Sequence, residues 1–449
     1  MSCSGSAPIV TANMAADHTW TNWAGTYSVT PQVTSHPADA AEVAAQIRHA
    51  AENDLSVKAV GAGHSFNGIA ITRGVMLHLD RLSGIVSADL ETGLVTVAAG
   101  TTLNVLNSAL WNMGLAMTNL GDIDSQTISG AISTGTHGTG LHVGGIATQV
   151  RGLELVSGAG EVVRCSADEN PEIFSVARVG LGALGVITEV TLQCEPAFLL
   201  QAVEAPADYD AVLEGLDAVI DAHNHFEFYW FPNTKRVLTT TNDRVPLKAG
   251  AQPVGRLRGW LDDEFLSNTV FEGINRLTTW RPGLIPAANS FAARALTSRK
   301  YSDRSYSVFS SPRRVRFEEM EYAVPRAALP YVIHEIEQWL QRNEERVGFP
   351  VEVRFAAADD IALSTAYGRQ TCYIAVHEYH RRRNQKYFLA FERIARSVEG
   401  RPHWGKLHYR SAIDLAPLYP QFNNFLEVRA QLDPDRRFNN DYLRRVLGT

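Results

Sequence analysis

The segment of the sequence that most clearly suggests chemistry is a turn that carries a histidine between small residues. Residues 59–67 read AVGAGHSFN, so a short strand ends in two glycines followed by His64 and Ser65. Glycine lets the backbone approach a ligand closely, and the N–H groups of such a turn can meet phosphate oxygens. A tight β-turn with a solvent-facing histidine gives the same pattern, and the spacing alone favours that simpler interpretation.

A second segment rich in small residues, residues 119–140, reads NLGDIDSQTISGAISTGTHGTG. Hydroxylated and small residues crowd it and it offers no apolar face to bury, so we expect a loop that faces a ligand. Its backbone N–H and hydroxyl groups carry little side-chain bulk, which suits a cradle for phosphate or flavin. Two cradles imply a long, charged cofactor. The GxGxxG pattern of a Rossmann fold is missing after the first strand, which disfavours NAD.

A third pattern pairs opposite charges in a predicted strand. Glu352 and Arg354 lie two residues apart in the segment VEVR, and in a strand this spacing places both side chains on one face. A carboxylate and a guanidinium can then converge on one substrate. A surface strand with an exposed salt bridge has the same pattern and is about as common.

Helix and strand patterns alternate around the two glycine-rich segments. Residues 36–54 and 101–115 repeat apolar residues at a helical period. Residues 56–60 form a short β-branched run that predicts a strand leading into the histidine turn. Further strands follow up to residue 196, where we expect the first domain to end.

The second half of the chain has an α+β pattern. Residues 243–300 are poorly periodic and contain prolines and tryptophans, so we expect helix and loop there. We therefore predict domains at 1–196 and 197–400, and a segment 401–449 that folds back on the first domain. The strands expected in the second domain lie at 225–231, 320–325, 351–355 and 372–379, and a helix is expected at 331–345.

Composition narrows the class of protein. With 449 residues, 45% of them hydrophobic and 20% charged, the chain is an ordinary globular protein of more than one domain. Its net charge of −7 argues against nucleic acid or an anionic membrane as the main partner, and a small, uncharged substrate fits better. The four cysteines lack CxxC spacing, so we expect free buried thiols and no metal site. No window reaches the roughly 20 apolar residues of a membrane span, and we predict a cytoplasmic protein.

Taken together, five segments resemble the vanillyl-alcohol-oxidase type flavoprotein superfamily, and within it the aldonolactone oxidases. The similarity runs in the same order from about Trp20 to the C-terminus. It implies an α+β protein of two domains, with an N-terminal FAD-binding domain and an α+β substrate (cap) domain. The five segments are AVGAGHSFN, NLGDIDSQTISGAISTGTHGTG, VEVR, RPHWGK and DPDRRFNNDYL.

The resemblance implies FAD held by a covalent bond from His64 to the 8α carbon of the flavin. Such N-alkylation withdraws electron density from the ring and raises its potential, which makes hydride acceptance easier. For His137, a loop histidine that stabilises its own turn is the alternative to a flavin contact. The implied FAD-binding residues are Gly61, Gly63, His64, Ser65, Phe66, Gly121, Ser129, Gly130, Thr134, Gly135, His137 and Gly138, with Val186 or Ile187 near the adenine half.

The resemblance also implies the substrate site. Glu352, Arg354 and Lys406 match residues that bind and activate the substrate, and Lys406 also matches a contact to the N1–C2=O region of the flavin. Oxidation of an alcohol sends hydride from carbon to flavin N5 and the hydroxyl proton to a base, while a cation stabilises the developing oxyanion. We expect His403 and Trp404 near the same cavity, although a core position is equally common for Trp404.

Asp122 departs from the alditol oxidases, which have serine at the matching position, and therefore weakens that assignment. The preceding Gly121 leaves a path for oxygen open, which favours an oxidase. The predicted reaction is oxidation of gulono- or arabinono-1,4-lactone at C2, with O2 or another acceptor reoxidising FAD. The alternatives are an alditol oxidase acting at C1 of xylitol or sorbitol, and a noncatalytic flavin- or sugar-binding protein.

Overall fold

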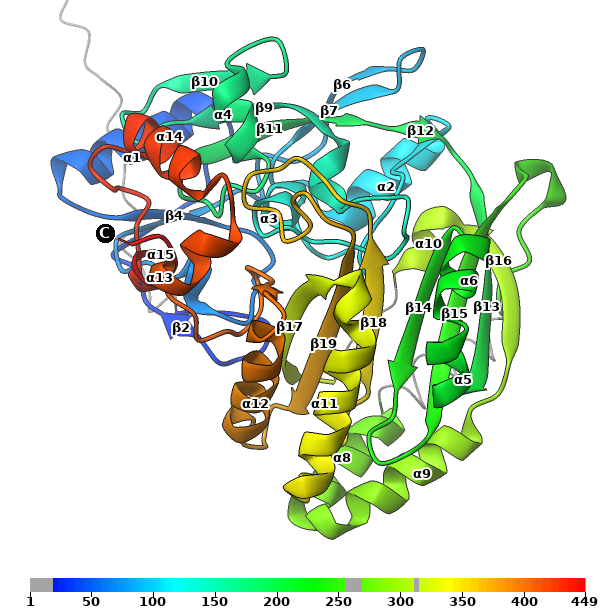
Figure 1. Cartoon of the computed structure of the whole chain (residues 1–449). Coiled ribbons are helices and arrows are strands. Elements are labelled where there is room, and N and C mark those ends of the chain that lie inside the picture. Colours follow the sequence, from blue (N-terminus) through cyan, green and yellow to red (C-terminus); the bar gives the residue numbers. More distant parts are fainter. Residues whose placement is uncertain (1–18, 256–268, 311–314, 449) are drawn as a thin grey trace, which may run out of the picture.

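The computed structural model describes residues 19–255, 269–310 and 315–448, which form three main sheets with surrounding helices (Figure 1). The N-terminal residues 1–18, which include Cys3, lie outside the described residues. The described cysteines, Cys165, Cys194 and Cys372, are buried free thiols, as predicted. No described helix is long and apolar enough to cross a membrane.

The first sheet is parallel and carries the histidine turn at the end of one strand. Its order is β3-β5-β4, and α1 packs on one face through Val43, Ala44, Ile47 and Ala50, the residues of the predicted helical period. Asp39 caps α1 by accepting a hydrogen bond from the backbone N–H of Glu42. The elements are β3 (Val33–Ser35), α1 (Ala40–Glu52), β4 (Val57–Val60) and β5 (Val75–His78).

The second sheet is antiparallel, with the order β10-β9-β11-β7-β6. A turn at residues 157–160 joins β9 to β10. Helices α2, α3 and α4 supply apolar side chains to a core shared with this sheet. The elements are β6 (Ile85–Asp89), β7 (Leu94–Ala98), α2 (Leu103–Asn112), α3 (Ile128–Ser133), β9 (Val150–Val156), β10 (Val162–Ser166), α4 (Pro171–Ala177) and β11 (Val186–Gln193).

The prediction that residues 119–140 have no apolar face is wrong in the middle of the segment. Ile128, Ala131 and Ile132 form the buried side of helix α3. Thr127 caps this helix by accepting a hydrogen bond from the backbone N–H of Gly130. Three apolar residues on a single short helix are too few to form a recognisable period, which is why the helix was missed.

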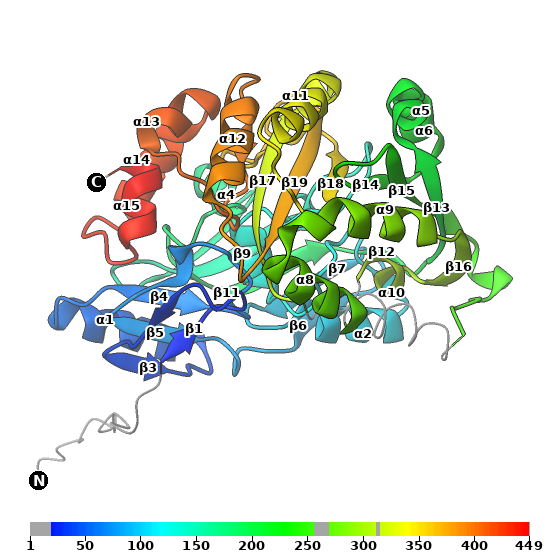
Figure 2. The same cartoon turned by 90° about the horizontal axis from the view of Figure 1, so that it is seen from below.

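The third sheet has eight strands in the order β16-β13-β15-β14-β18-β19-β17-β20. Helices α5, α6, α11 and α12 cover the face that points away from the two smaller sheets (Figure 2). The elements are β13 (Leu199–Asp208), α5 (Tyr209–Glu214), α6 (Leu216–Ala222), β14 (His225–Trp230), β15 (Arg236–Val245), β16 (Arg299–Arg304), β17 (Phe317–Pro325), α11 (Leu329–Arg342), β18 (Val351–Ala356), β19 (Thr371–Tyr379), α12 (Gln385–Arg396) and β20 (Arg401–Pro402).

The C-terminal segment packs against the first two sheets. The backbone N–H of Val57 donates to the carbonyl of Arg437, and Asn440 Nδ2 donates to the carbonyls of Gly68, Ile69 and Ile71. The domain limits at 196 and 400 remain a proposal. Strand β20 (Arg401–Pro402) lies just after the second limit but still pairs with β17 in the eight-stranded sheet. The elements are α13 (Ala412–Leu415), α14 (Phe422–Leu432) and α15 (Asp441–Leu447).

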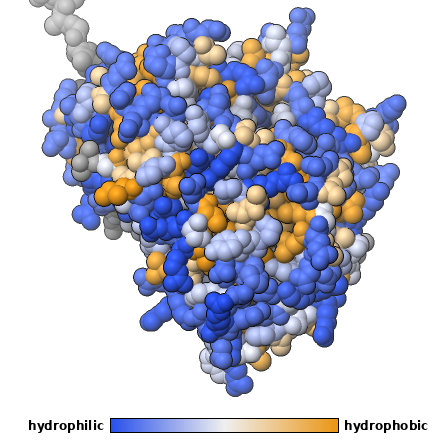
Figure 3. Space-filling view, in the orientation of Figure 1, coloured by the Kyte–Doolittle hydropathy of each residue, from blue (hydrophilic) through white to orange (hydrophobic). Residues whose placement is uncertain are grey.

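Residues 246–298 contain helix and loop where they are described, as predicted, whereas residues 243–245 and 299–300 belong to β15 and β16. Residues 256–268 lie outside the described residues. Hydrophilic side chains dominate the face of the molecule seen in Figure 3, with scattered apolar ones between them. The remaining elements are β1 (Trp20–Thr21), β2 (Ser28–Val29), β8 (Leu115–Ala116), β12 (Glu195–Pro196), α8 (Phe271–Trp280), α9 (Ile285–Ala295) and α10 (Ser305–Phe309).

Candidate active site

Two cavities meet at the histidine turn. The first, of about 120 Å³, is lined by the turn, the start of α3 and residues 181, 182 and 185–187. The second, of about 80 Å³, lies against strands β17, β18 and β19 of the eight-stranded sheet. Both cavities are lined by His64, Ser65, Gln126 and Thr134. The two cavities therefore suit one long ligand whose ends sit in different chemical surroundings.

The histidine turn lies close against the start of helix α3. A Cβ atom at Gly61 would come within 2.4 Å of Thr127 Oγ1, so a side chain at this position would push the turn and the helix apart. Ser129, Gly130 and Thr134 of the second glycine-rich segment line the same cavity, together with Val186 and Ile187. Backbone N–H groups and hydroxyls thus surround the first cavity with little bulk, which fits a dinucleotide.

His64 is half-buried and lines both cavities. It is therefore not the solvent-facing histidine of a simple β-turn, which the spacing alone had favoured. Its Nε2 atom lies 2.8 Å from Ser125 Oγ, and its ring stacks on Trp23 with centroids 5.5 Å apart. Burial and the charge of Lys406 lower the pKa of His64 to about 4. At neutral pH the imidazole is therefore uncharged, the form in which a ring nitrogen is nucleophilic.

The remaining residues of the predicted cofactor set fall in different places. Phe66, Gly121 and His137 line the second cavity. Gly135 and Gly138 are not among the residues that line either cavity. Gly138 packs closely against the backbone of Leu120 instead.

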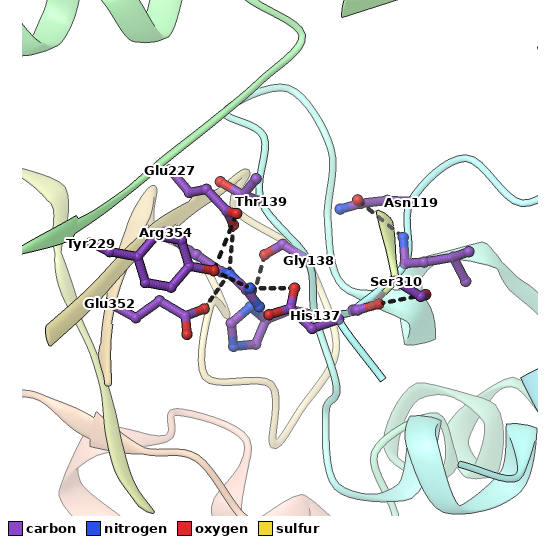
Figure 4. Close-up of polar contacts among 12 residues, drawn as sticks. Asn119, His137, Gly138, Thr139, Glu227, Tyr229, Ser310, Glu352 and Arg354 are labelled. Carbon is purple, nitrogen blue, oxygen red and sulfur yellow. Dashed lines mark hydrogen bonds and ion pairs between the residues drawn. The ribbon is translucent and has the colours of Figure 1, made fainter. Parts of the chain in front are cut away.

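Arg354 is the buried centre of the charged groups in the second cavity (Figure 4). Its Nε atom lies 2.8 Å from Glu227 Oε2 and 2.5 Å from Glu352 Oε1, and its Nη2 atom forms an ion pair with Asp122. Burial disfavours the charged guanidinium, but the three carboxylates outweigh it and hold the pKa of Arg354 well above its usual value. As predicted, Glu352 and Arg354 share one face of their strand, β18.

Lys406 forms a second ion pair in the same cavity. Its Nζ atom lies 2.5 Å from Glu319 Oε2 and 5.1 Å from the centre of the Phe66 ring. Burial lowers the pKa of Lys406, but Glu319 and Glu321 outweigh that effect and the net shift is upward. His403 lines the cavity beside it, whereas Trp404 lies in the core.

Several cavity residues were missed by sequence reasoning. Glu319 and Glu321 of strand β17 and His377 of strand β19 line the second cavity. The two glutamates have the same spacing of two residues as Glu352 and Arg354, so the strand period was a usable signal for them. Their position beside the pair on β18 follows from the strand order β18-β19-β17, which is not a local property of the sequence.

His137, Glu321 and His403 form a buried cluster whose ligand-type atoms all lie within 4.8 Å of one another. His137 Nδ1 lies 2.9 Å from the Gly138 carbonyl, which can only accept, so this nitrogen carries a proton. His137 Nε2 lies 3.1 Å from Glu321 Oε1, and that contact requires a second proton. His403 Nδ1 accepts a hydrogen bond from the Gly405 N–H at 3.0 Å. The contacts therefore suit a shared proton between His137 and Glu321 better than a metal ion.

The fold and the cavities define a two-domain flavoprotein, and residues 31–166 match the family model described as FAD binding domain. Residues 190–446 match the model described as D-arabinono-1,4-lactone oxidase. The chain belongs to this lactone oxidase family, which confirms the resemblance seen in the sequence.

Curated relatives support this assignment, and solved structures show the fold. The chain is 42% identical to an L-gulono-1,4-lactone dehydrogenase of Mycobacterium tuberculosis, over 96% of this chain and 99% of the relative. It is 36% identical to an L-gulonolactone oxidase of Bos taurus, over 95% of this chain and 97% of the relative. A cholesterol oxidase of B. sterolicum superposes with a TM-score of 0.81 at 17% identity, covering 98% of this chain and 100% of that structure. The last match shows a shared fold.

Proposed function

We propose that the protein oxidises a sugar 1,4-lactone, gulono- or arabinono-1,4-lactone, by hydride transfer to FAD. The observation that carries this proposal is the pair of cations, the buried Arg354 and the half-buried Lys406, each held by a carboxylate in the cavity that reaches His64. Membership of the D-arabinono-1,4-lactone oxidase family supports the substrate class.

FAD, when bound, supplies the flavin N5 atom that accepts the hydride. We propose that the backbone around Gly61, Ser129 and Gly130 holds the dinucleotide and that His64 bonds covalently to the flavin 8α carbon. The uncharged imidazole of His64 supports this bond, because a protonated ring could not attack. Protein precipitated with acid should keep its yellow colour, and the variant His64→Ala should release its flavin to the supernatant. A colourless pellet from the unmutated protein would remove the covalent bond from the proposal.

The charged side chains of the second cavity bind the substrate and stabilise the charge that develops during the reaction. Lys406 and Arg354 donate hydrogen bonds to the substrate oxygen that loses its proton, and they stabilise the negative charge that develops there. Glu352, which pairs with Arg354 on the same strand, accepts the hydroxyl proton as the hydride leaves the adjacent carbon. Asp122 fits this arrangement because it pairs with Arg354, so a serine at this position would leave the arginine with one carboxylate fewer.

Anaerobic bleaching of the flavin, measured across a panel of lactones and open-chain alditols, tests the reaction and the substrate class together. We expect rapid bleaching by 1,4-lactones and slow bleaching by xylitol or sorbitol. The variants Glu352→Gln and Arg354→Ala should each lower the rate of bleaching by about 100-fold or more. Faster bleaching by alditols would make the protein an alditol oxidase, and no bleaching by any member would leave a noncatalytic flavin protein.

We propose O2 as the acceptor that reoxidises FAD, and a cytoplasmic location; both stay predictions. Gly121 lines the second cavity without a side chain that could block oxygen. A Cβ atom there would lie 3.0 Å from the His137 carbonyl oxygen, so Gly121→Ala would disturb the loop as well as the path. The rate of O2 consumption, compared with that of an artificial acceptor in the unmutated protein, is therefore the cleaner test.

A further inference from the structure

The first cavity contains a buried lysine that the proposed hydride transfer does not use. Lys58 lies on strand β4, is 3% exposed and lines the cavity beside the histidine turn. Its Nζ atom donates to the Gly182 carbonyl at 3.0 Å and to the Phe438 carbonyl at 3.4 Å. Among the described residues, no carboxylate lies within ion-pair distance of it, and both of these partners are uncharged.

A second buried cation lies behind Lys58. Arg429 of helix α14 is 1% exposed, and its Nε and Nη2 atoms have no hydrogen-bond partner in the described part of the chain. Burial and Arg429 lower the pKa of Lys58 to about 7, although Asp433 favours its charged form. Asp433 already accepts hydrogen bonds from the backbone N–H groups of Arg437 and Phe438. The two buried cations, Lys58 and Arg429, thus depend on the single carboxylate of Asp433, which already accepts two backbone hydrogen bonds.

Such an imbalance is costly unless an anion enters, because a buried charge needs a partner of opposite sign. The first cavity has room for that anion, and the backbone N–H groups of the histidine turn already favour one there. FAD offers a suitable anion in its diphosphate, which is doubly negative at neutral pH.

We propose that Lys58 binds the diphosphate of the dinucleotide through an ionic hydrogen bond, with Arg429 behind it adding positive potential. This inference rests on the proposed function only in taking FAD as the cofactor, and it assigns the anionic contact to a strand residue outside the glycine turn. Lys58 also donates hydrogen bonds from β4 to the carbonyls of Gly182 and Phe438. If its role were purely structural, these two hydrogen bonds would be its whole contribution and it would not bind the diphosphate.

The test uses the His64→Ala protein, in which no covalent bond masks the binding equilibrium. Calorimetry measures the binding of ADP, which carries a diphosphate, and of adenosine, which does not. Adding Lys58→Met should weaken ADP binding by about 10- to 100-fold, the range for a hydrogen bond to a charged group, and change adenosine binding less than about twofold. Lys58→Arg should recover most of the ADP affinity. Lys300→Met, at an exposed lysine of strand β16, is the matched control and should change neither.

An equal loss for ADP and adenosine, or no loss for either, would overturn the proposal, and neither result depends on lactone turnover. If Lys58→Met does not fold, proton uptake in the His64→Ala protein alone decides the question. FAD binding should take up a proton near pH 7 to 8, because the diphosphate restores the charge of Lys58. Arg429 and Asp433 are the charged groups that shift the pKa of Lys58, and burial together with Arg436 lowers the pKa of Arg429 to about 10, which is still above this range. Binding without proton uptake would also contradict the proposal.

Discussion

At the scale of the residue, Arg354 illustrates how much of the site depends on one planar group. Its guanidinium meets Asp122, Glu227 and Glu352, which come from a loop and from two neighbouring strands. A guanidinium presents several fixed donors, whereas an ammonium is a single compact charge. The arginine therefore fixes the position of three carboxylates, of which Asp122 and Glu352 line the second cavity, in addition to supplying its own charge.

The variant Arg354→Lys keeps the positive charge at this position but removes the planar set of donors, so it tests the two contributions separately. We expect normal flavin content, because Arg354 does not line the first cavity, and flavin reduction by the lactone slowed about 100-fold. Rapid mixing under anaerobic conditions measures the reduction rate. Arg236→Lys, at an exposed arginine of β15, is the control and should reduce at the normal rate. Reduction by Arg354→Lys at half the normal rate or faster would show that positive charge alone suffices.

Lys58 leads to a prediction on the stability of the cofactor-free protein. Its pKa is about 7 in the folded chain against an ordinary value of 10.5, so between these values the unfolded state binds more protons. Stability from this residue therefore rises with pH across that window and is lost as the pH falls through 7. Urea unfolding of the His64→Ala apoprotein at pH 7 and pH 9.5 measures the rise. The same comparison on Lys58→Met should show a smaller rise, and an equal rise would mean that Lys58 is not the group responsible.

At the scale of the element, the contact between the histidine turn and helix α3 sets the shape of the first cavity. Because Gly61 faces Thr127 so closely, Gly61→Ala should lower covalent flavin incorporation and the melting temperature. Thr127→Ala alone removes a helix cap at a cost of about 1 kcal/mol. The double variant should regain flavin incorporation relative to Gly61→Ala, since the clashing hydroxyl is gone.

Flavin fluorescence of the denatured protein measures the incorporation. Gly273→Ala is the control, because a Cβ atom on this helical glycine would meet open space, and it should leave incorporation unchanged. If the two single effects simply added in the double variant, the close contact would not be the cause of the loss.

The elements also show what the sequence could reveal. The period of α1 and the spacing of Glu352 and Arg354 are local patterns, and both predictions were correct. Helix α3 was missed because it is short and lies among residues typical of loops. The meeting of Glu319 with Lys406, and of Asp122 with Arg354, depends on strand order and loop packing, which local patterns do not contain.

At the scale of the whole molecule, one threonine joins the second glycine-rich segment to the eight-stranded sheet. The Thr139 hydroxyl donates to the Phe226 carbonyl and accepts from the Phe355 N–H at 3.2 Å. The Thr139 carbonyl lies 2.7 Å from His225 Nδ1, and Gly140 forms a bridge with Ala356. The loop that carries His137 and the strand that carries Arg354 are thus fixed to each other, and both line the second cavity.

Thr139→Val removes the hydroxyl while keeping the shape of the side chain, and leaves two buried backbone groups without this partner. We expect full covalent flavin, because the first cavity is untouched, and a fall of about tenfold or more in kcat/KM for the lactone, because small displacements of substrate-holding groups slow transfer steeply. Thr278→Val is the matched control: this threonine is equally buried, but its hydroxyl bonds only within its own helix. If both variants lost the same activity, general destabilisation would explain the loss. A loss of activity in Thr139→Val alone, with intact flavin, would show that hydride transfer depends on the contact between the Thr139 loop and the eight-stranded sheet.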